Sequence, residues 1–356
     1  TYIELMDKTY YLNHYYFMSL VSFVMIFLPA NAYFSVDCYK NKDLAFAKIP
    51  RWNLDILKIM LAVVYFYAGL AKINSDWLLE AMPLRIWLPA NADLPFIGFL
   101  LKETWVAYVF SWFGMIYDLG IVLLLLYKPT RLIGFAMVVA FHVLTRILFP
   151  IGVFPYVMII STLVFFDAAF HQKILFFISN LVRIPTTIWE NNKTKNTRFT
   201  NLYQTKLVFL SSFLIVQLAF PFRYFLYSNE LFWTEEGYRF SWRVMLMEKA
   251  GYTEFKVTDS ISKKTIYVDN SLFLTRFQEK QMSFQPDFIV QYANYLHDFY
   301  KKQGINNPIV TAESYVALNG RLSQRYIDPT INLAQEHDTF QHKSWILPFN
   351  DTIKGF

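Results

Sequence analysis

Cysteine and charge are both scarce in this sequence. The chain of 356 residues has a single cysteine, Cys38, so it can form neither an intrachain disulfide nor a metal site built on several cysteines. Only 17% of the residues are charged, whereas 55% are hydrophobic and 19% are aromatic. The mean hydropathy is +0.28. A chain this apolar is not an ordinary soluble protein, and its composition indicates a membrane protein.

Two further features limit the function classes. Residues 1–10 carry charges of both signs, so no secretory signal peptide is visible, and without an initiating Met we expect the chain to be a fragment. The isoelectric point near 9.0 could indicate nucleic-acid binding. However, the basic residues lie in short loops between apolar runs, which is typical of a topology signal rather than of a phosphate-binding groove. We therefore expect membrane lipids as partners and no nucleic acid.

Long apolar runs are abundant. A bilayer crossing takes about 20 apolar residues. Six segments meet this length, at residues 11–36, 54–73, 105–127, 131–149, 151–170 and 206–227. The stretch between the second and third segments is broken by proline, which predicts an interfacial or re-entrant piece. Residues 171–185 have the pattern of an amphipathic surface segment.

The sequence changes character after residue 227. Residues 254–269 predict two strands joined by a polar turn, residues 286–304 an amphipathic helix ended by Gly304, and residues 308–321 a strand and turn. The predicted fold class is therefore a polytopic α-helical membrane bundle, residues 1–227, followed by a small α+β extramembrane domain, residues 228–356.

The distribution of basic residues predicts an orientation. One set of loops carries Lys40, Lys42, Lys48, Arg51, Lys128, Arg131, Lys173, Arg183, Lys193, Lys195 and Arg198. The opposite loops carry mainly Arg85 and Lys102. We expect the first set to be cytoplasmic. With six spans, residue 1 and the C-terminal domain then lie on the extracytoplasmic or luminal side.

Ionisable residues inside the predicted spans are candidates for function, because each costs about 2.5–3.5 kcal/mol at mid-bilayer. They are His14, Lys72, Asp118, His142, Arg146 and Arg223. The orientation puts His14, Lys72, His142 and Arg146 together in the outer half of the membrane, as a site would require. The residues alone leave structural interpretations open. Lys72 fits a helix end that reaches the interface, and His142 or Arg146 fits a partner of Asp118.

Residues 67–77, "YAGLAKINSDW", place Lys72 at the end of an apolar run. A lysine side chain ordinarily titrates near about 10.4 and is a poor base at neutral pH. Desolvation favours the neutral amine. A role as general base therefore predicts a buried position, and a membrane pocket also suits a lipophilic substrate.

Longer motifs carry a family resemblance. "NHYYFMSLVSFVMIFLPANAYFSVD", "YFYAGLAKINSDWL", "FHVLTRILFPIGVFPYVMI", "WTEEGYRFSWRVML" and "YIDPTINLAQEHDTFQHKSWILP" occur in this order. They resemble the vitamin K-dependent γ-carboxylase family, whose membrane part is called the horizontally transferred transmembrane (HTTM) domain. The resemblance covers residues 10–348. It implies an enzyme that oxygenates reduced vitamin K to its 2,3-epoxide with O2 and carboxylates glutamate with CO2, without a metal.

The resemblance also implies roles for individual residues. Lys72 matches the base that deprotonates the hydroquinone, and His14 matches a histidine important for the coupled reaction. The predicted substrate-binding residues are Asn13, Arg85, His142, Arg146, Tyr238 and Trp242. Of these, Arg146 rests on the topology, which puts it on one helix face with His142 in the outer half of the membrane, and Arg85 matches only after a three-residue deletion.

Several departures from the animal members keep alternatives open. Ala71 stands where they have a second lysine, and their disulfide between membrane and luminal parts cannot form here. We also expect their long C-terminal β-rich region and their first membrane helix to have no counterpart among these residues. The quinone could therefore be menaquinol, and epoxidation could occur without carboxylation of a glutamate-containing peptide or protein. A non-catalytic quinone-binding, lipid-binding or transport protein is the remaining alternative.

Overall fold

The computed structural model describes residues 2–45, 48–183 and 201–356. These residues form two compact units. The first unit comprises residues 12–69 and 116–220, and the second comprises residues 2–11, 70–115 and 221–356. Three basic residues of the predicted cytoplasmic set, Lys193, Lys195 and Arg198, lie outside the described residues. The predicted domain boundary after residue 227 remains a prediction.

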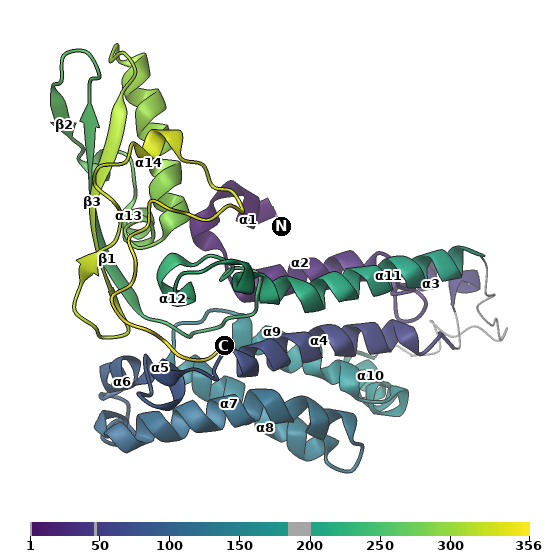
Figure 1. Ribbon diagram of the computed structural model, residues 1–356. Coiled ribbons are helices and arrows are strands. Elements are labelled where there is room, and N and C mark those ends of the chain that lie inside the picture. Colours follow the sequence, from purple (N-terminus) through teal and green to yellow (C-terminus); the bar gives the residue numbers. More distant parts are fainter. Residues whose placement is uncertain (1, 46–47, 184–200) are drawn as a thin grey trace. The chain divides into compact units, whose positions relative to one another are not determined.

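Outside residues 71–103, the described chain between residues 13 and 226 consists mainly of helices (Figure 1). They are α2 (Asn13–Met25), α3 (Val36–Lys40), α4 (Trp52–Leu70), α7 (Thr104–Leu126), α8 (Arg131–Leu148), α9 (Phe154–Thr162), α10 (Ala168–Val182) and α11 (Asn201–Ala219), with the 3-10 turns η2 (Lys42–Leu44), η5 (Leu163–Phe165) and η7 (Phe220–Leu226). Among the described residues, four helices are long and apolar enough to cross a membrane: Trp52–Leu70, Thr104–Leu126, Arg131–Leu148 and Gln204–Leu226.

Two of the six predicted spans, the first and the fifth, differ from the helices found. The first is shorter, because α2 ends at Met25 after 13 residues. At about 1.5 Å per residue this helix falls short of a bilayer core of about 30 Å, and Pro29 prevents its continuation. The fifth is one arm of a pair, Phe154–Phe165 and Ala168–Val182, bent by 120°. The number of membrane passes remains a prediction.

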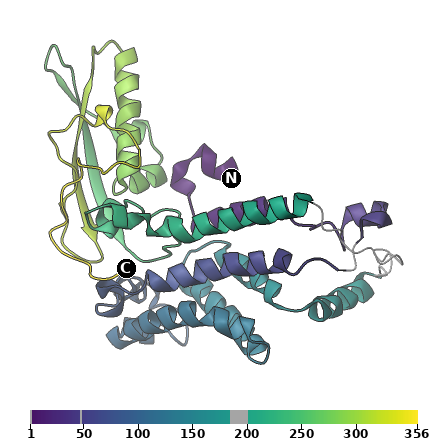
Figure 2. The same cartoon turned by 45° about the vertical axis from the view of Figure 1, so that its right-hand side comes forward.

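Side chains within the first unit explain how its helices pack. Helices α2 and α11 run side by side in Figures 1 and 2, and the Tyr16 hydroxyl donates to Gln217 Oε1 over 3.0 Å. The rings of Phe23 and Phe213 lie 5.6 Å apart between the same helices. Close approach of α4 to α7 requires Gly69, since a Cβ there would lie 2.7 Å from Leu119 Cγ. This explains the glycine of the "YAGLAK" motif.

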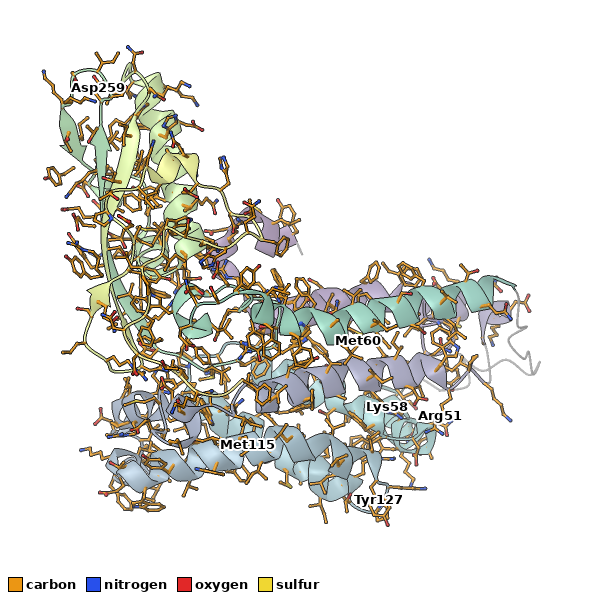
Figure 3. The ribbon with its side chains drawn as sticks, viewed as in Figure 1. Arg51, Lys58, Met60, Met115, Tyr127 and Asp259 are labelled. Carbon is orange, nitrogen blue, oxygen red and sulfur yellow. The ribbon has the colours of Figure 1, made fainter. Side chains whose placement is uncertain are left out.

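Charged residues mark the beginning of α4. Asp55 lies 3.3 Å from the guanidinium of Arg51 and 4.0 Å from the ammonium of Lys58. Figure 3 labels Arg51 and Lys58 at this end of the helix and Tyr127 just after α7. Arg51 is exposed and Asp55 and Lys58 are half-buried, and all three lie in or near the first two turns of α4, as expected for charged residues at the edge of an apolar bundle.

The second unit contains an antiparallel sheet of four strands in the order β2-β1-β3-β4. The strands are β1 (Lys249–Thr258), β2 (Thr265–Tyr267), β3 (Ile309–Leu318) and β4 (Gln324–Arg325). The long pair β1 and β3 is in register from Lys249 opposite Leu318 to Thr258 opposite Ile309. Figure 3 shows Asp259 at the tip of the β1–β2 hairpin, where its carboxylate accepts from the backbone N–H of Ile261 over 2.9 Å.

Helix α14 (Pro286–Lys302) lies along the sheet in Figures 1 and 2, next to α13 (Arg276–Met282). Its apolar face packs on the strands, and the ring of Tyr292 lies 5.0 Å from that of Phe255. Thr275 and Gln278 form a capping box at the start of α13, and Gly304 follows α14 with a φ of +95°. The strands, helix and turn predicted for residues 254–321 are therefore confirmed.

Short elements fill the rest of the second unit. They are α1 (Tyr2–Met6), η1 (Lys8–Tyr10), α5 (Ser75–Leu78), α6 (Leu84–Trp87), η3 (Pro89–Asn91), η4 (Leu100–Lys102), α12 (Leu231–Thr234), η8 (Asn270–Leu272) and η9 (Leu333–Gln335). The stretch between α4 and α7 contains only such short pieces, as its prolines predicted. The fold class is thus confirmed: a mostly helical protein with candidate membrane-spanning helices and a small antiparallel sheet in its C-terminal part.

Candidate active site

The residues that follow α4 form a tight turn, called here the Lys72 turn, residues 70–78. Asn74 organises it, since its side-chain oxygen accepts from the Trp77 backbone N–H over 2.9 Å and its side-chain nitrogen donates to the Ala71 carbonyl over 2.8 Å. Asn74 is therefore the N-cap of α5. A single asparagine thus ties the residues before and after it into one unit.

Lys72 is buried within this turn, with 6% of its surface exposed. Its Nζ lies 5.3 Å from the centroid of the Trp77 ring. The Trp77 indole is fixed in turn by a hydrogen bond of 2.8 Å to the Ser111 carbonyl on α7. An amine held against an anchored aromatic ring is not a helix end extended into water. The burial expected for a lysine base is therefore present.

Asp76 binds residues far along the chain. Arg321 donates from Nη1 to Asp76 Oδ2 and from Nη2 to Oδ1, each over 2.7 Å. Asn319 adds a third donor to Oδ2, also over 2.7 Å. Asp76, Asn319 and Arg321 are called the clamp below. Hydrogen bonding to Asp76 and then to Asp351 raises the pKa of the Arg321 guanidinium above its ordinary value, so this member of the clamp stays positively charged.

Residues near the end of the chain also contact the Lys72 turn. The Ser75 N–H donates to the Lys354 carbonyl over 2.7 Å, and the Phe356 N–H donates to the Ile73 carbonyl over 2.9 Å. Gly355 makes this approach possible, because a Cβ there would lie 2.2 Å from the Ile73 carbonyl oxygen. Beside this contact lies a cavity of about 430 Å³ that is lined in part by Asn74, Tyr224 and Glu230. Burial raises the pKa of the Glu230 carboxyl.

A second group of candidate residues lies in the first unit and is called the histidine cluster: His14, Tyr65, His142 and Phe154. His142 is 1% exposed, and its Nε2 lies 3.1 Å from the Tyr65 hydroxyl. The ring centroids of His14 and His142 lie 5.9 and 5.6 Å from that of Phe154. Both predicted histidines therefore pack against one phenylalanine, although 128 positions separate them in the printed sequence.

The remaining predicted site residues differ in burial. Trp242 is 2% exposed, and Tyr238 is partly buried, with burial raising the pKa of its hydroxyl. Asn13 is the first residue of α2 and half-buried. Arg146 is exposed although His142 lies one turn before it, so the two do not share one buried face. Exposed Arg85 pairs with Glu80 over 3.5 Å.

Comparisons with known families match nearly the whole chain. The family model for the HTTM domain matches residues 1–170, and the model for the vitamin K-dependent gamma-carboxylase lumenal domain matches residues 202–352. The chain belongs to the vitamin K-dependent gamma-carboxylase family. It is thus a gamma-carboxylase-like membrane protein with a lumenal-type domain. No solved structure matches the chain.

The clamp connects the two parts of this carboxylase-family chain. Asp76 lies in the segment that matches the HTTM domain, whereas Asn319 and Arg321 lie in the segment that matches the lumenal domain. The sequence did not identify Asn319 or Arg321 as part of the site, because the "NGR" that follows a predicted strand also fits an ordinary turn. The available signal was Asp76 itself, since a carboxylate in a buried motif needs a cationic partner.

Metal binding gains no support from the geometry. In the described part of the chain, no group of three or more His, Cys, Asp or Glu side chains is arranged to hold a metal ion. The second unit offers a buried amine with an aromatic ring beside it, and the first unit, described by itself, offers a cluster with two histidines. These groups are suited to proton transfer and to binding of a flat, lipophilic molecule.

Proposed function

We propose that this protein is a membrane enzyme that oxygenates a lipophilic quinol to its 2,3-epoxide and couples this reaction to carboxylation of glutamyl side chains. The proposal assigns the role of general base to Lys72. The observation that carries it is the burial of the Lys72 amine against Trp77, within the "AGLAKINSDW" motif of a gamma-carboxylase family member. Reduced vitamin K or menaquinol is the proposed co-substrate, with O2 and CO2.

The proposed task of Lys72 is to accept a proton from a hydroxyl group of the quinol. The quinol, when bound, supplies this proton and the electrons that reduce O2. Burial of the amine excludes water and so limits competing proton transfer. The aromatic face of Trp77 fits a ring-shaped substrate as well as the amine. No metal is required for this step.

The histidine cluster is proposed to contribute a second function. His14 is assigned to the coupled reaction, and His142 is assigned to substrate binding with its ring held by Tyr65. The contacts of both rings with Phe154 support a shared task, since moving one ring would disturb the packing of the other. Further proposed substrate contacts, to the quinol or to a glutamate-containing peptide, are Asn13, Arg85, Arg146, Tyr238 and Trp242.

The test separates the two half-reactions. Purified protein in detergent is supplied with reduced vitamin K or menaquinol, O2, labelled bicarbonate and a glutamate-containing peptide. Quinone epoxide and fixed label are then measured separately. We expect both products from the natural sequence and a loss of both from Lys72→Ala. Lys102→Ala serves as the matched control, because Lys102 is an exposed lysine in the same unit.

Each outcome has a distinct meaning. Unchanged epoxide formation by Lys72→Ala contradicts the assignment of the base. Epoxide without fixed label supports a quinol epoxidase that does not carboxylate protein. If neither product forms with either quinol, the proposal that the protein is an enzyme is contradicted. A quinone-binding, lipid-binding or transport protein is then the remaining interpretation.

A further inference from the structure

We propose that Arg321 is a positioning residue for Lys72 and acts through Asp76. This inference rests on the proposed role of Lys72 as the base, and it adds a residue from the lumenal-type segment to that reaction. Arg321 does not itself contact the reacting atoms. It holds the carboxylate next to Trp77, the residue whose ring supports the Lys72 amine.

The geometry of the clamp supports a positioning role. Both terminal nitrogens of Arg321 bind one oxygen each of Asp76 over 2.7 Å. Such a two-point contact fixes orientation as well as distance, which a single hydrogen bond cannot do. Asp76 is 2% exposed, so water is not available to replace a lost partner. Trp77 follows Asp76 directly in the chain, so a rotation of the Asp76 backbone would also move the indole.

Arg321 is itself held from two other directions. Its Nε donates to Asp351 over 2.8 Å, and its guanidinium lies 5.5 Å from the centroid of the Phe349 ring. Asp351 and Phe349 both belong to the segment that continues to Gly355 and pairs with the backbone of Ile73 and Ser75. Residues 319–356 therefore support the Lys72 turn in two ways: they bind the Asp76 side chain, and they pair with the backbone of Ile73 and Ser75.

The alternative is an ion pair that stabilises only the fold. That role predicts that removing Arg321 loosens the whole second unit, in which case every buried amine becomes more accessible. A positioning role predicts a change confined to the Lys72 turn. The unit offers an internal comparison in Lys249, a buried lysine whose Nζ binds Glu235 over 2.8 Å and the Trp233 carbonyl over 2.7 Å.

The experiment measures amine accessibility and turnover in parallel. The full chain in detergent is exposed briefly to an acetylating reagent, and mass spectrometry quantifies acetylation of Lys72, of Lys249 and of exposed Lys263 as the reference. Arg321→Gln is compared with Arg321→Lys, which keeps the charge without the planar two-point contact. The matched control is Arg325→Gln on β4, where an arginine that is 48% exposed in its side chain pairs with Glu313 over 3.5 Å.

For Arg321→Gln we expect acetylation of Lys72 to rise severalfold while that of Lys249 stays unchanged. In the epoxide assay kcat should fall by about tenfold to a hundredfold, as for a misplaced catalytic group, with the KM for quinol unchanged. Arg321→Lys should recover part of kcat, and Arg325→Gln should match the natural sequence. In an Asp76→Asn background, Arg321→Gln should add little, because both changes break the same contact.

Other outcomes overturn the inference. Equal rises at Lys72 and Lys249 would mean that Arg321 only stabilises the unit. No change in Lys72 acetylation would mean that the clamp does not position the amine. If the natural sequence forms no epoxide, the proposed function fails, whereas a selective change at Lys72 would still establish the positioning contact.

Discussion

The two units bury polar side chains in different ways. In the first unit, His142 meets Tyr65 through one hydrogen bond and is otherwise surrounded by aromatic rings. In the second unit, three buried or largely buried carboxylates have cationic partners: Asp76 pairs with Arg321, Glu235 with Lys249, and Asp287 with Arg239. The apolar helical unit therefore accommodates buried polar side chains through ring packing, whereas the mixed unit accommodates them through charge pairs. The Lys72 turn belongs to the second kind, although its sequence continues an apolar helix.

The position of the Lys72 turn in the second unit has a consequence for the proposed chemistry. The turn follows α4 directly, but its contacts come from residues 319–356. A reaction centred on Lys72 therefore depends on the integrity of the lumenal-type segment. Substitutions of Lys249, Tyr65 and Asp351, in order of decreasing expected effect, test whether the units differ in how they accommodate polar groups.

Breaking the buried pair of Lys249 and Glu235 should have the largest effect on stability. Burial lowers the pKa of the Lys249 amine, an effect that the Glu235 carboxylate opposes. Lys249→Met keeps the volume but leaves Glu235 buried without its cation, which should cost about 3–5 kcal/mol of unfolding free energy. Thermal unfolding of the full chain, followed by tryptophan fluorescence, measures the loss.

The control for this prediction lies on the same strand. Lys256 pairs with Glu313 over 3.4 Å, and both side chains are more than a quarter exposed. Lys256→Met should cost under about 1 kcal/mol, as is usual for pairs near the surface. Equal losses in the two variants would contradict the view that buried charge pairs stabilise the second unit.

Removing the Tyr65 hydroxyl should have an intermediate effect, since this hydroxyl is a hydrogen-bond partner of the buried His142 ring. Tyr65→Phe preserves the aromatic ring but removes the hydroxyl group that forms a hydrogen bond with His142 Nε2. We expect a loss of about 1–3 kcal/mol, the cost of a buried polar group that loses its partner. The matched control is Tyr127→Phe, because Tyr127 is 63% exposed. If Tyr65→Phe lowers the unfolding free energy as much as Lys249→Met does, the two units do not differ in how they accommodate buried polar groups.

Acid should weaken the second unit through a smaller effect at Asp351. Hydrogen bonds from Arg321 and from the Thr352 backbone hold the pKa of this carboxyl below its ordinary value. A carboxyl with a lowered pKa contributes stability above its unfolded pKa of about 3.9, and this contribution is lost as the pH falls through the folded value. Asp351→Asn should therefore flatten the fall in melting temperature at acid pH.

Melting temperatures measured between pH 6 and about pH 3 test this expectation. Asp298→Asn, on the exposed side of α14, is the control and should retain the acid dependence of the natural sequence. An acid dependence that is the same in Asp351→Asn and in the natural sequence would show that Asp351 does not contribute.

The sequence predicted the elements whose cause is local. The helix over residues 286–304 has a proline at its first turn and a glycine after its last, and both act within a few residues. The first of the two strands within residues 254–269, β1, alternates in burial, and a polar turn joins it to the exposed strand β2. The shorter α2 escaped prediction because apolar composition continues past Met25, whereas the helix does not. Composition predicts burial in lipid, but Pro29 decides where the helix can end.

The candidate site was predictable in part. The motif around Lys72 and the histidines of the first unit were evident from residue type and position. The packing of His14 and His142 on Phe154 was not, because it depends on how α2, α8 and α9 meet. Nor did the i and i+4 spacing of His142 and Arg146 ensure a shared environment, since helix packing buries one residue and leaves the other exposed.

The sequence by itself determined that the chain is a membrane protein of the carboxylase family, because apolar runs and long motifs are properties of the chain. It also placed one lysine in the motif that the proposed chemistry requires. The tertiary structure decided what surrounds that lysine. Asp76 and Arg321 are separated by 245 positions, and no local rule links them. Only folding brings the two residues together, where the burial of Asp76 makes its carboxylate require a partner.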